Sequence, residues 1–178
     1  MTAQTNLAQS SAPASKPFVI TRTFDAPRDV VFEAWTGLEG VKNWMGPKGV
    51  SLIKATNDLR PGGMLHYLLR TQDGKEMWGK WTYSEIKKPE RVIAVVAFTD
   101  EGGEKILPHP MAPDWPAESL SLCEFAEKNG KTTVTVTWQP LNPTPAQQRA
   151  FDAGHEGMTM GWTGSLDKLD AYLAGITK

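Results

Sequence analysis

The sequence predicts an α+β fold in which a curved antiparallel sheet of seven strands wraps around one long C-terminal helix. Three observations lead to this prediction. The first strand is followed by two short helices, the middle of the chain holds six short strands separated by turn signals, and the last thirty residues repeat large side chains at helical spacing. Consecutive hairpins imply antiparallel pairing, and the long helix must then cover the concave face of the sheet. We describe this as a helix-grip architecture.

The first elements follow from local signals. Phe18–Phe24 is rich in β-branched and aromatic residues and predicts the first strand, and helices are expected after Pro27 and around residues 38–44. Turn signals then separate six strands; they are Pro61-Gly62-Gly63, Asp73-Gly74, Lys88-Pro89-Glu90 and Asn129-Gly130. We expect these strands at residues 50–57, 64–70, 76–86, 92–98, 118–127 and 131–138.

The turn at residues 129–130 fixes the register of the last hairpin if it contains two residues. Ser121 then opposes Trp138, and Cys123 shares their inward face because directly opposed residues point the same way. This register leaves two neighbouring leucines on the outer face, and a bulged turn would shift it.

The C-terminal helix has a defined start. Thr144 can serve as N-cap, Pro145 occupies the first helical position, and Gln147 completes a capping box. We expect one helix from Thr144 to Ala174. Its large side chains recur every three or four residues and define one face; they are Phe151, His155, Met158, Trp162, Leu166, Leu169 and Leu173.

Four glycines run beside this apolar face, at Gly154, Gly157, Gly161 and Gly164. Each costs a helix about 1 kcal/mol relative to alanine, so the set costs roughly 3–4 kcal/mol. We therefore expect them to serve a close backbone approach or an open space against the sheet. Together with His155 and two methionines, they favour a cavity between helix and sheet; the alternative is a plain amphipathic core helix.

Length and charge bound the class of protein. A chain of 178 residues suggests one domain, which we place at 17–178, after a disordered tail of small polar residues at 1–16. The net charge is −1, so no basic excess indicates a nucleic-acid partner. The longest apolar run, 92–98, is too short for membrane insertion. No signal-peptide core is present in the tail, and we expect a cytoplasmic monomer or homodimer.

Residues with catalytic potential are few. The single cysteine, Cys123, excludes an internal disulfide and is expected to be a buried, inert thiol. His66, His109 and His155 lack metal-ligand spacing, and the segment HEGMT lacks the second histidine of a zinc protease helix. We predict no metal, no cofactor and no catalytic residue. His155 keeps two interpretations, as a core histidine or as a group that touches a ligand or acts as acid or base.

The segment 99–117 is the most distinctive loop. Its four prolines predict a stiff segment without regular structure, and long loops of this kind are often functional. Two interpretations stay open. The loop is a lid in which Trp115 or Met111 closes over a ligand, with Gly102-Gly103 as hinge, or it is a rigid surface loop whose Trp115 packs on the domain edge.

Four segments resemble, in order, the START-like (SRPBCC) superfamily: FVITRTFDAPRDVVFEAWT, DLRPGGMLHYLLRTQDGKE, YSEIKKPERV and GWTGSLDKLDAYL. They are most similar to the branch named for activators of the ATPase of the 90-kDa heat-shock protein, over about residues 17–176. The resemblance implies a helix-grip fold enclosing an apolar cavity. It does not fix the function, because the superfamily includes lipid carriers, hormone receptors, polyketide cyclases and co-chaperones.

Two departures from the family pattern bear on function. Trp44-Met45 stands where the family often has two tryptophans, which changes the expected cavity wall. The co-chaperones that name the family carry a separate amino-terminal domain where this sequence has a tail of sixteen residues. We therefore place the co-chaperone function, with a heat-shock chaperone as partner, second.

Binding of a small hydrophobic molecule is the function we expect first, in an apolar cavity of about 300–1,000 Å³. A cyclase- or hydrolase-like enzyme is a further alternative, with His155, His66, Tyr67 and Ser121 as its candidate groups. The predicted ligand-binding residues come from the sheet, the loop and the long helix; they are Tyr67, Trp78 or Trp81, Met111, Trp115, Phe151, His155, Met158 and Trp162.

Overall fold

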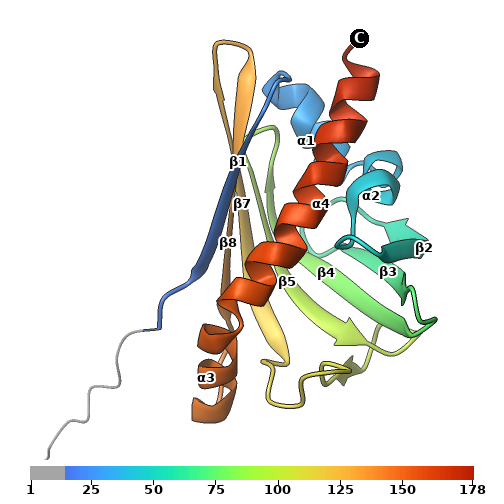
Figure 1. Cartoon of the computed structure of the whole chain (residues 1–178), viewed down its shortest axis with the longest axis vertical. Helices are drawn as coiled ribbons and strands as arrows, with labels where there is room; N and C mark the ends of the chain where they lie inside the picture. The colour runs from blue at the N-terminus through green and yellow to red at the C-terminus, as the bar shows by residue number, and fades with distance from the viewer. Residues whose placement is uncertain (1–14) are drawn as a thin grey trace, which may run out of the picture.

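The computed structural model describes residues 15–178. Figure 1 shows a strongly curved sheet whose concave face is crossed by one long helix, with two short helices packed near one end. The fold class predicted from the sequence is therefore confirmed. The predicted disordered tail at 1–16 lies, apart from its last two residues, outside the described residues.

The sheet is antiparallel throughout, and its strands are hydrogen-bonded in the order β1-β8-β7-β5-β4-β3-β2. The strands are β1 (Phe18–Phe24), β2 (Val50–Asn57), β3 (Met64–Thr71), β4 (Glu76–Lys87), β5 (Arg91–Thr99), β7 (Glu118–Lys128) and β8 (Lys131–Pro140). A short additional strand, β6 (Ile106–Leu107), pairs with β5 outside this order. Register shifts between Leu52 and Lys54 in β2, and between Tyr83 and Glu85 in β4, mark bulges that increase the curvature of the sheet.

The last hairpin has the predicted register, with Ser121 opposite Trp138. Asn129 and Gly130 both have positive φ, at 53° and 74°, as a two-residue hairpin turn requires. The outward leucines, Leu120 and Leu122, are half-buried, because the residues directly opposite them on β5 also carry apolar side chains. Cross-strand contacts on the outer face therefore partly bury the two leucines that this register turns outward.

The two short helices, α1 (Arg28–Thr36) and α2 (Leu38–Trp44), cover one end of the core. Trp44 donates its indole hydrogen to the carbonyl of Ala34 at 3.0 Å and stacks on Trp35 at 4.5 Å between ring centroids. These contacts tie the two helices together and bring Trp44 to the edge of the interior. No helix among the described residues is long and apolar enough to cross a membrane.

The C-terminal helix begins with the predicted capping box at Thr144 and Gln147, but it is not one continuous helix. It divides into α3 (Pro145–Ala153) and α4 (His155–Ile176). At the junction, the Gly154 N–H is shared between the carbonyls of Ala150 and Phe151, each at 3.0 Å. The prediction of a single helix is wrong here because a tertiary contact, the packing of Trp115 on Gly154, acts at the position where the helix is weakest.

The glycines of α4 have different surroundings. A Cβ atom at Gly164 would lie 2.9 Å from the backbone nitrogen of Lys48, so this glycine permits a close approach of the α2–β2 loop. A Cβ atom at Gly161 would meet only the Cβ of Pro47, at 3.8 Å. Gly157 has nothing within 4 Å. The expectation that Gly157 faces the sheet is therefore wrong, since it lies on the exposed side of the helix.

Candidate functional site

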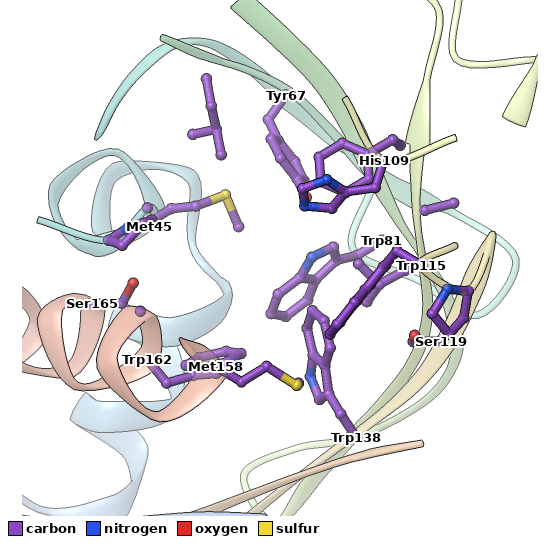
Figure 2. A pocket seen from close by; sticks show the side chains of 18 of the residues that line it. Met45, Tyr67, Trp81, His109, Trp115, Ser119, Trp138, Met158, Trp162 and Ser165 are labelled. Atoms are coloured by element: carbon purple, nitrogen blue, oxygen red, sulfur yellow. The ribbon is translucent and has the colours of Figure 1, made fainter. Parts of the chain in front are cut away.

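A pocket of about 250 Å³, partly open to solvent, lies between the concave face of the sheet and α4. This volume is below the expected range of about 300–1,000 Å³. Strands β3, β4, β5, β7 and β8 supply one side, α4 supplies the other, and the α2–β2 and β6–β7 loops close the ends. Figure 2 shows aromatic side chains from the sheet facing Met158, Trp162 and Ser165 of α4.

Three tryptophans form one corner of this pocket, Trp81 from β4, Trp138 from β8 and Trp162 from α4 (Figure 2). Their ring centroids lie 5.7–6.5 Å apart, and their planes meet at angles of 49°, 74° and 84°. In edge-to-face packing of this kind, the positive edge of one ring contacts the negative face of another. The three rings therefore present differently oriented faces to a ligand. Behind Trp162, the ring of Trp35 stacks at 5.9 Å and fixes its orientation.

Tyr67 forms the sheet side of the pocket and owes its position to a glycine. Its cross-strand partner is Gly79, and a Cβ atom there would lie 2.7 Å from both the Cζ and the Oη of Tyr67. The phenol ring therefore lies flat over β4 at Gly79, in the space that a side chain at this position would fill. Burial raises the pKa of Tyr67 to about 12, against a lowering contribution from the indole of Trp81. The hydroxyl is protonated at neutral pH and can donate a hydrogen bond.

The wall formed by Met45, Gly46 and Pro47 is held against α4 by Lys168. The Lys168 ammonium donates to the carbonyls of Gly46, Pro47 and Val50 at 2.8, 3.1 and 3.1 Å. Burial lowers the pKa of Lys168. An ammonium with three acceptors and the close approach at Gly164 together fasten this loop to the helix.

The loop before β7 supplies the other end of the pocket. His109, Trp115 and Pro116 line the pocket, and the Trp115 ring packs 5.5 Å from that of Phe151. This segment is not wholly irregular, because Ile106–Leu107 forms the short strand β6 paired with β5. The prediction that prolines exclude regular structure is wrong for these two residues, which precede the first proline and are aligned by the Asp100–Lys105 turn.

His109 is held in a neutral form by geometry. The backbone N–H of Met111 donates to His109 Nδ1 at 3.1 Å, so this nitrogen is an acceptor without a proton. Burial lowers the pKa of His109, which favours the same state. Its ring meets Phe98 edge-on at 4.8 Å. The imidazole therefore contributes a polar but uncharged surface to the pocket.

Five of the residues predicted to bind a ligand are brought together around the pocket; they are Tyr67, Trp81, Trp115, Met158 and Trp162. Phe151 is fully buried behind Trp115, and His155 packs edge-on between Phe18 and Phe151 with its Nε2 buried and without a hydrogen-bond partner. Neither lines the pocket. Contact of any of these residues with a ligand stays a prediction.

Trp78 and Met111 lie elsewhere. Trp78 stacks on His66 at 4.8 Å, three residues from the inward Trp81 and therefore on the opposite face of the strand. The sequence left the choice between Trp78 and Trp81 open, and the pocket contains Trp81. The Met111 side chain is 62 % exposed and does not line the pocket. Of the two loop residues considered for a lid, only Trp115 borders the space.

Met45, which the resemblance led us to expect in the cavity wall, lines the pocket. Several other lining residues were missed from the sequence, among them Phe98, His109, Ser119 and Trp138. The signal for Trp138 was available, because its alternation with Thr135 and Thr137 already placed it on the inward face. Ser119 had a signal as well, because it lies two residues before Ser121 on the same face of β7. His109 gave no comparable signal, since its position depends on how the segment before β7 folds back against Phe98 of β5.

Other reactive groups lie outside the pocket. Cys123 is buried as predicted, and burial raises the pKa of its thiol to about 12. Among residues 15–178, no group of three or more His, Cys, Asp or Glu side chains is placed to hold a metal ion.

Comparison with protein families gives a match over residues 25–174 to the family described as Activator of Hsp90 ATPase homolog 1-like protein. The chain belongs to this family. The match spans both short helices, most of the sheet and most of α4, and thus contains the whole pocket. No curated protein matches the sequence.

Solved structures of similar fold come from several bacteria. A protein from Nitrosomonas europaea shares 21 % identity with a TM-score of 0.73, covering 92 % of this chain and 97 % of its own. A Staphylococcus epidermidis protein shares 26 % identity with a TM-score of 0.68, covering 88 % of each chain. The family protein of Silicibacter pomeroyi shares 20 % identity with a TM-score of 0.66, covering 89 % of this chain and 98 % of its own.

Proposed function

We propose that this member of the family binds a small apolar molecule in the pocket between the sheet and α4. One observation carries the proposal. The large aromatic side chains around the pocket pack against one another and still leave a space of about 250 Å³ between them. A core selected only for stability would close such a space, because unfilled apolar volume is destabilising.

The size of the pocket limits the ligand. An apolar protein cavity of about 150 Å³ accommodates benzene, so this space fits a two-ring aromatic molecule rather than a long acyl chain. Burial of apolar surface at about 25 cal/mol per Å² supplies the main driving force. The aromatic walls add stacking and edge-to-face contacts.

Two glycine variants in the same helix test this proposal. Gly161→Leu places a side chain in the pocket, whereas Gly157→Leu, one turn away, places the same side chain in open space. We expect two-ring aromatic probes such as 2-isopropenylnaphthalene to raise the melting temperature of the unmodified protein and of Gly157→Leu. Gly161→Leu should lose this response while remaining folded.

The opposite pattern would contradict the proposal. Equal stabilisation of Gly161→Leu and the unmodified protein would place the probe elsewhere on the surface. No stabilisation of any of the three proteins, across a series of two-ring compounds at millimolar concentration, would leave the open volume as a packing feature without a ligand.

Two other functions stay predictions from the resemblance. A co-chaperone role follows from the family description, which names an activator of the Hsp90 ATPase. An enzyme role would require a ligand to reach Tyr67 or a histidine. Measurement of heat-shock ATPase turnover with and without this protein tests the first, and product analysis with any probe that binds tests the second.

A further inference from the structure

The pocket that we propose as a binding site carries no formal charge. Among its described lining residues there is no Asp, Glu, Lys or Arg, and His109 is neutral because its Nδ1 accepts a hydrogen bond from Met111. The ammonium of Lys168, which holds the pocket wall at residues 46–47, already donates to three backbone carbonyls. A carboxylate or ammonium that entered this pocket would lose its hydration without gaining an opposite charge. The lining therefore favours a neutral ligand.

Three hydroxyl groups lie among the lining residues of the pocket. Tyr67, Ser119 and Ser165 all line it, from β3, β7 and α4 respectively (Figure 2). No hydrogen bond within residues 15–178 takes up the hydroxyl hydrogen of Tyr67. Tyr67 is thus a fixed donor, held flat over Gly79 and beside the aromatic corner.

These features define a chemical class. We infer that the pocket selects a neutral, planar, two-ring aromatic molecule bearing a carbonyl or ether oxygen that accepts a hydrogen bond from Tyr67. The rings lie against Trp81, Trp138 and Trp162, and the oxygen points to the sheet. This inference rests on the proposed function and narrows it, because it excludes fatty acids and other carboxylates as preferred ligands.

Three naphthalene derivatives of similar size separate the possibilities. 2-Acetylnaphthalene carries the acceptor, 2-isopropenylnaphthalene replaces its oxygen by a CH₂ group, and 2-naphthoate adds a charge. We expect the ketone to bind the unmodified protein about five- to tenfold more tightly than the alkene, which corresponds to one hydrogen bond. The carboxylate should bind at least about tenfold more weakly than the ketone, since its charge is not matched. Titration calorimetry gives all three dissociation constants.

Two tyrosine variants assign the effect. Tyr67→Phe removes only the hydroxyl, so the ratio of alkene to ketone dissociation constants should fall to about one. Tyr172→Phe makes the same change on α4 outside the pocket and should keep the original ratio. Melting temperatures verify that both variants are folded, and the ratio within one protein is independent of any small change in its stability.

The outcomes distinguish the inference from the function on which it rests. If the ketone and the alkene bind equally, or if 2-naphthoate binds most tightly, the ligand class is wrong while apolar binding stands. If the ratio survives in Tyr67→Phe, the donor is another group and the role of Tyr67 is overturned. If none of the three compounds binds, the proposed function fails and the inference fails with it.

Discussion

Trp115 lies so close to Gly154 that a Cβ atom at Gly154 would come within 2.6 Å of the Cζ3 atom of the indole. Trp115 belongs to the loop before β7, and Gly154 is the junction of α3 and α4. The same indole packs on Phe151 and borders the pocket. The absence of a side chain at Gly154 therefore links the junction of α3 and α4 to the position of Trp115 at the end of the pocket.

The variant Gly154→Ala tests this connection. The methyl group would overlap the indole, and overpacking costs about 1–3 kcal/mol, which a helix-propensity gain of about 1 kcal/mol offsets only in part. We expect a lower free energy of unfolding in urea and a changed Trp fluorescence spectrum. Gly157→Ala is the matched control, because its methyl group meets open space and should stabilise the protein by up to about 1 kcal/mol. Equal stabilisation by both substitutions would contradict the close packing of Trp115.

Trp115 also provides a test of the lid hypothesis. Its indole covers the end of the pocket, so Trp115→Ala should speed the release of a bound probe such as 2-acetylnaphthalene more than it slows association. Stopped-flow fluorescence measures both rates. Met111→Ala changes the same loop at a side chain that is 62 % exposed and outside the pocket, and it should leave both rates unchanged. Unaltered release from Trp115→Ala would show that the loop is a rigid border.

Most of the sheet could be predicted because its signals are local. β1 and β2 have the predicted bounds, since both strands are rich in β-branched residues and are flanked by turn residues. The last hairpin register followed from Asn129-Gly130, whose positive φ values fix a two-residue turn. β6 escaped prediction because two residues carry no periodic pattern, and their pairing depends on a turn that closes against β5.

The candidate site was less predictable because it depends on contacts between distant segments. Gly157 and Gly164 look alike in the sequence, yet only Gly164 meets another backbone, at Lys48. Phe151 shares the helical stripe with Trp162 but lies beyond the bend, where Trp115 separates it from the pocket. Periodicity identified the inward face of the helix, whereas the position of each residue along the pocket required the loop and the sheet.

Lys168 should be important for the pocket wall. Lys168→Met keeps most of the apolar stem but leaves the carbonyls of residues 46, 47 and 50 without their shared donor. We expect a loss of about 1–3 kcal/mol in the free energy of unfolding, the usual range for unpaired polar groups, together with weaker probe binding. Lys42→Met is the control, since Lys42 is exposed and pairs with Glu39 only at 3.6 Å, and it should change stability by less than about 0.5 kcal/mol. Similar effects of both changes would contradict the structural role of Lys168.

The free energy of unfolding should fall in alkaline solution, because a buried thiol and a buried phenol keep their protons in the folded protein. The pKa of Cys123 rises from 9.0 to about 12 on burial, so between these values the folded protein binds a proton that the unfolded chain releases. Stability from this group is therefore complete below pH 9 and is lost as pH rises toward 12, by about 1.4 kcal/mol per pH unit at most. Tyr67 acts in the same direction, but only from pH 10 to about 12.

Cys123→Ala separates these two contributions. Urea unfolding at pH 8, 9 and 10 should show a decline of about 2 kcal/mol for the unmodified protein, beginning near pH 9, and most of it comes from the unfolded thiol, which ionises there. In the variant the decline should begin about one pH unit later, where the unfolded tyrosines ionise. The comparison uses the change with pH within each protein, so the cost of the small cavity left by alanine cancels. Identical pH dependence in both proteins would mean that the thiol is not shielded by the sheet and helices around it.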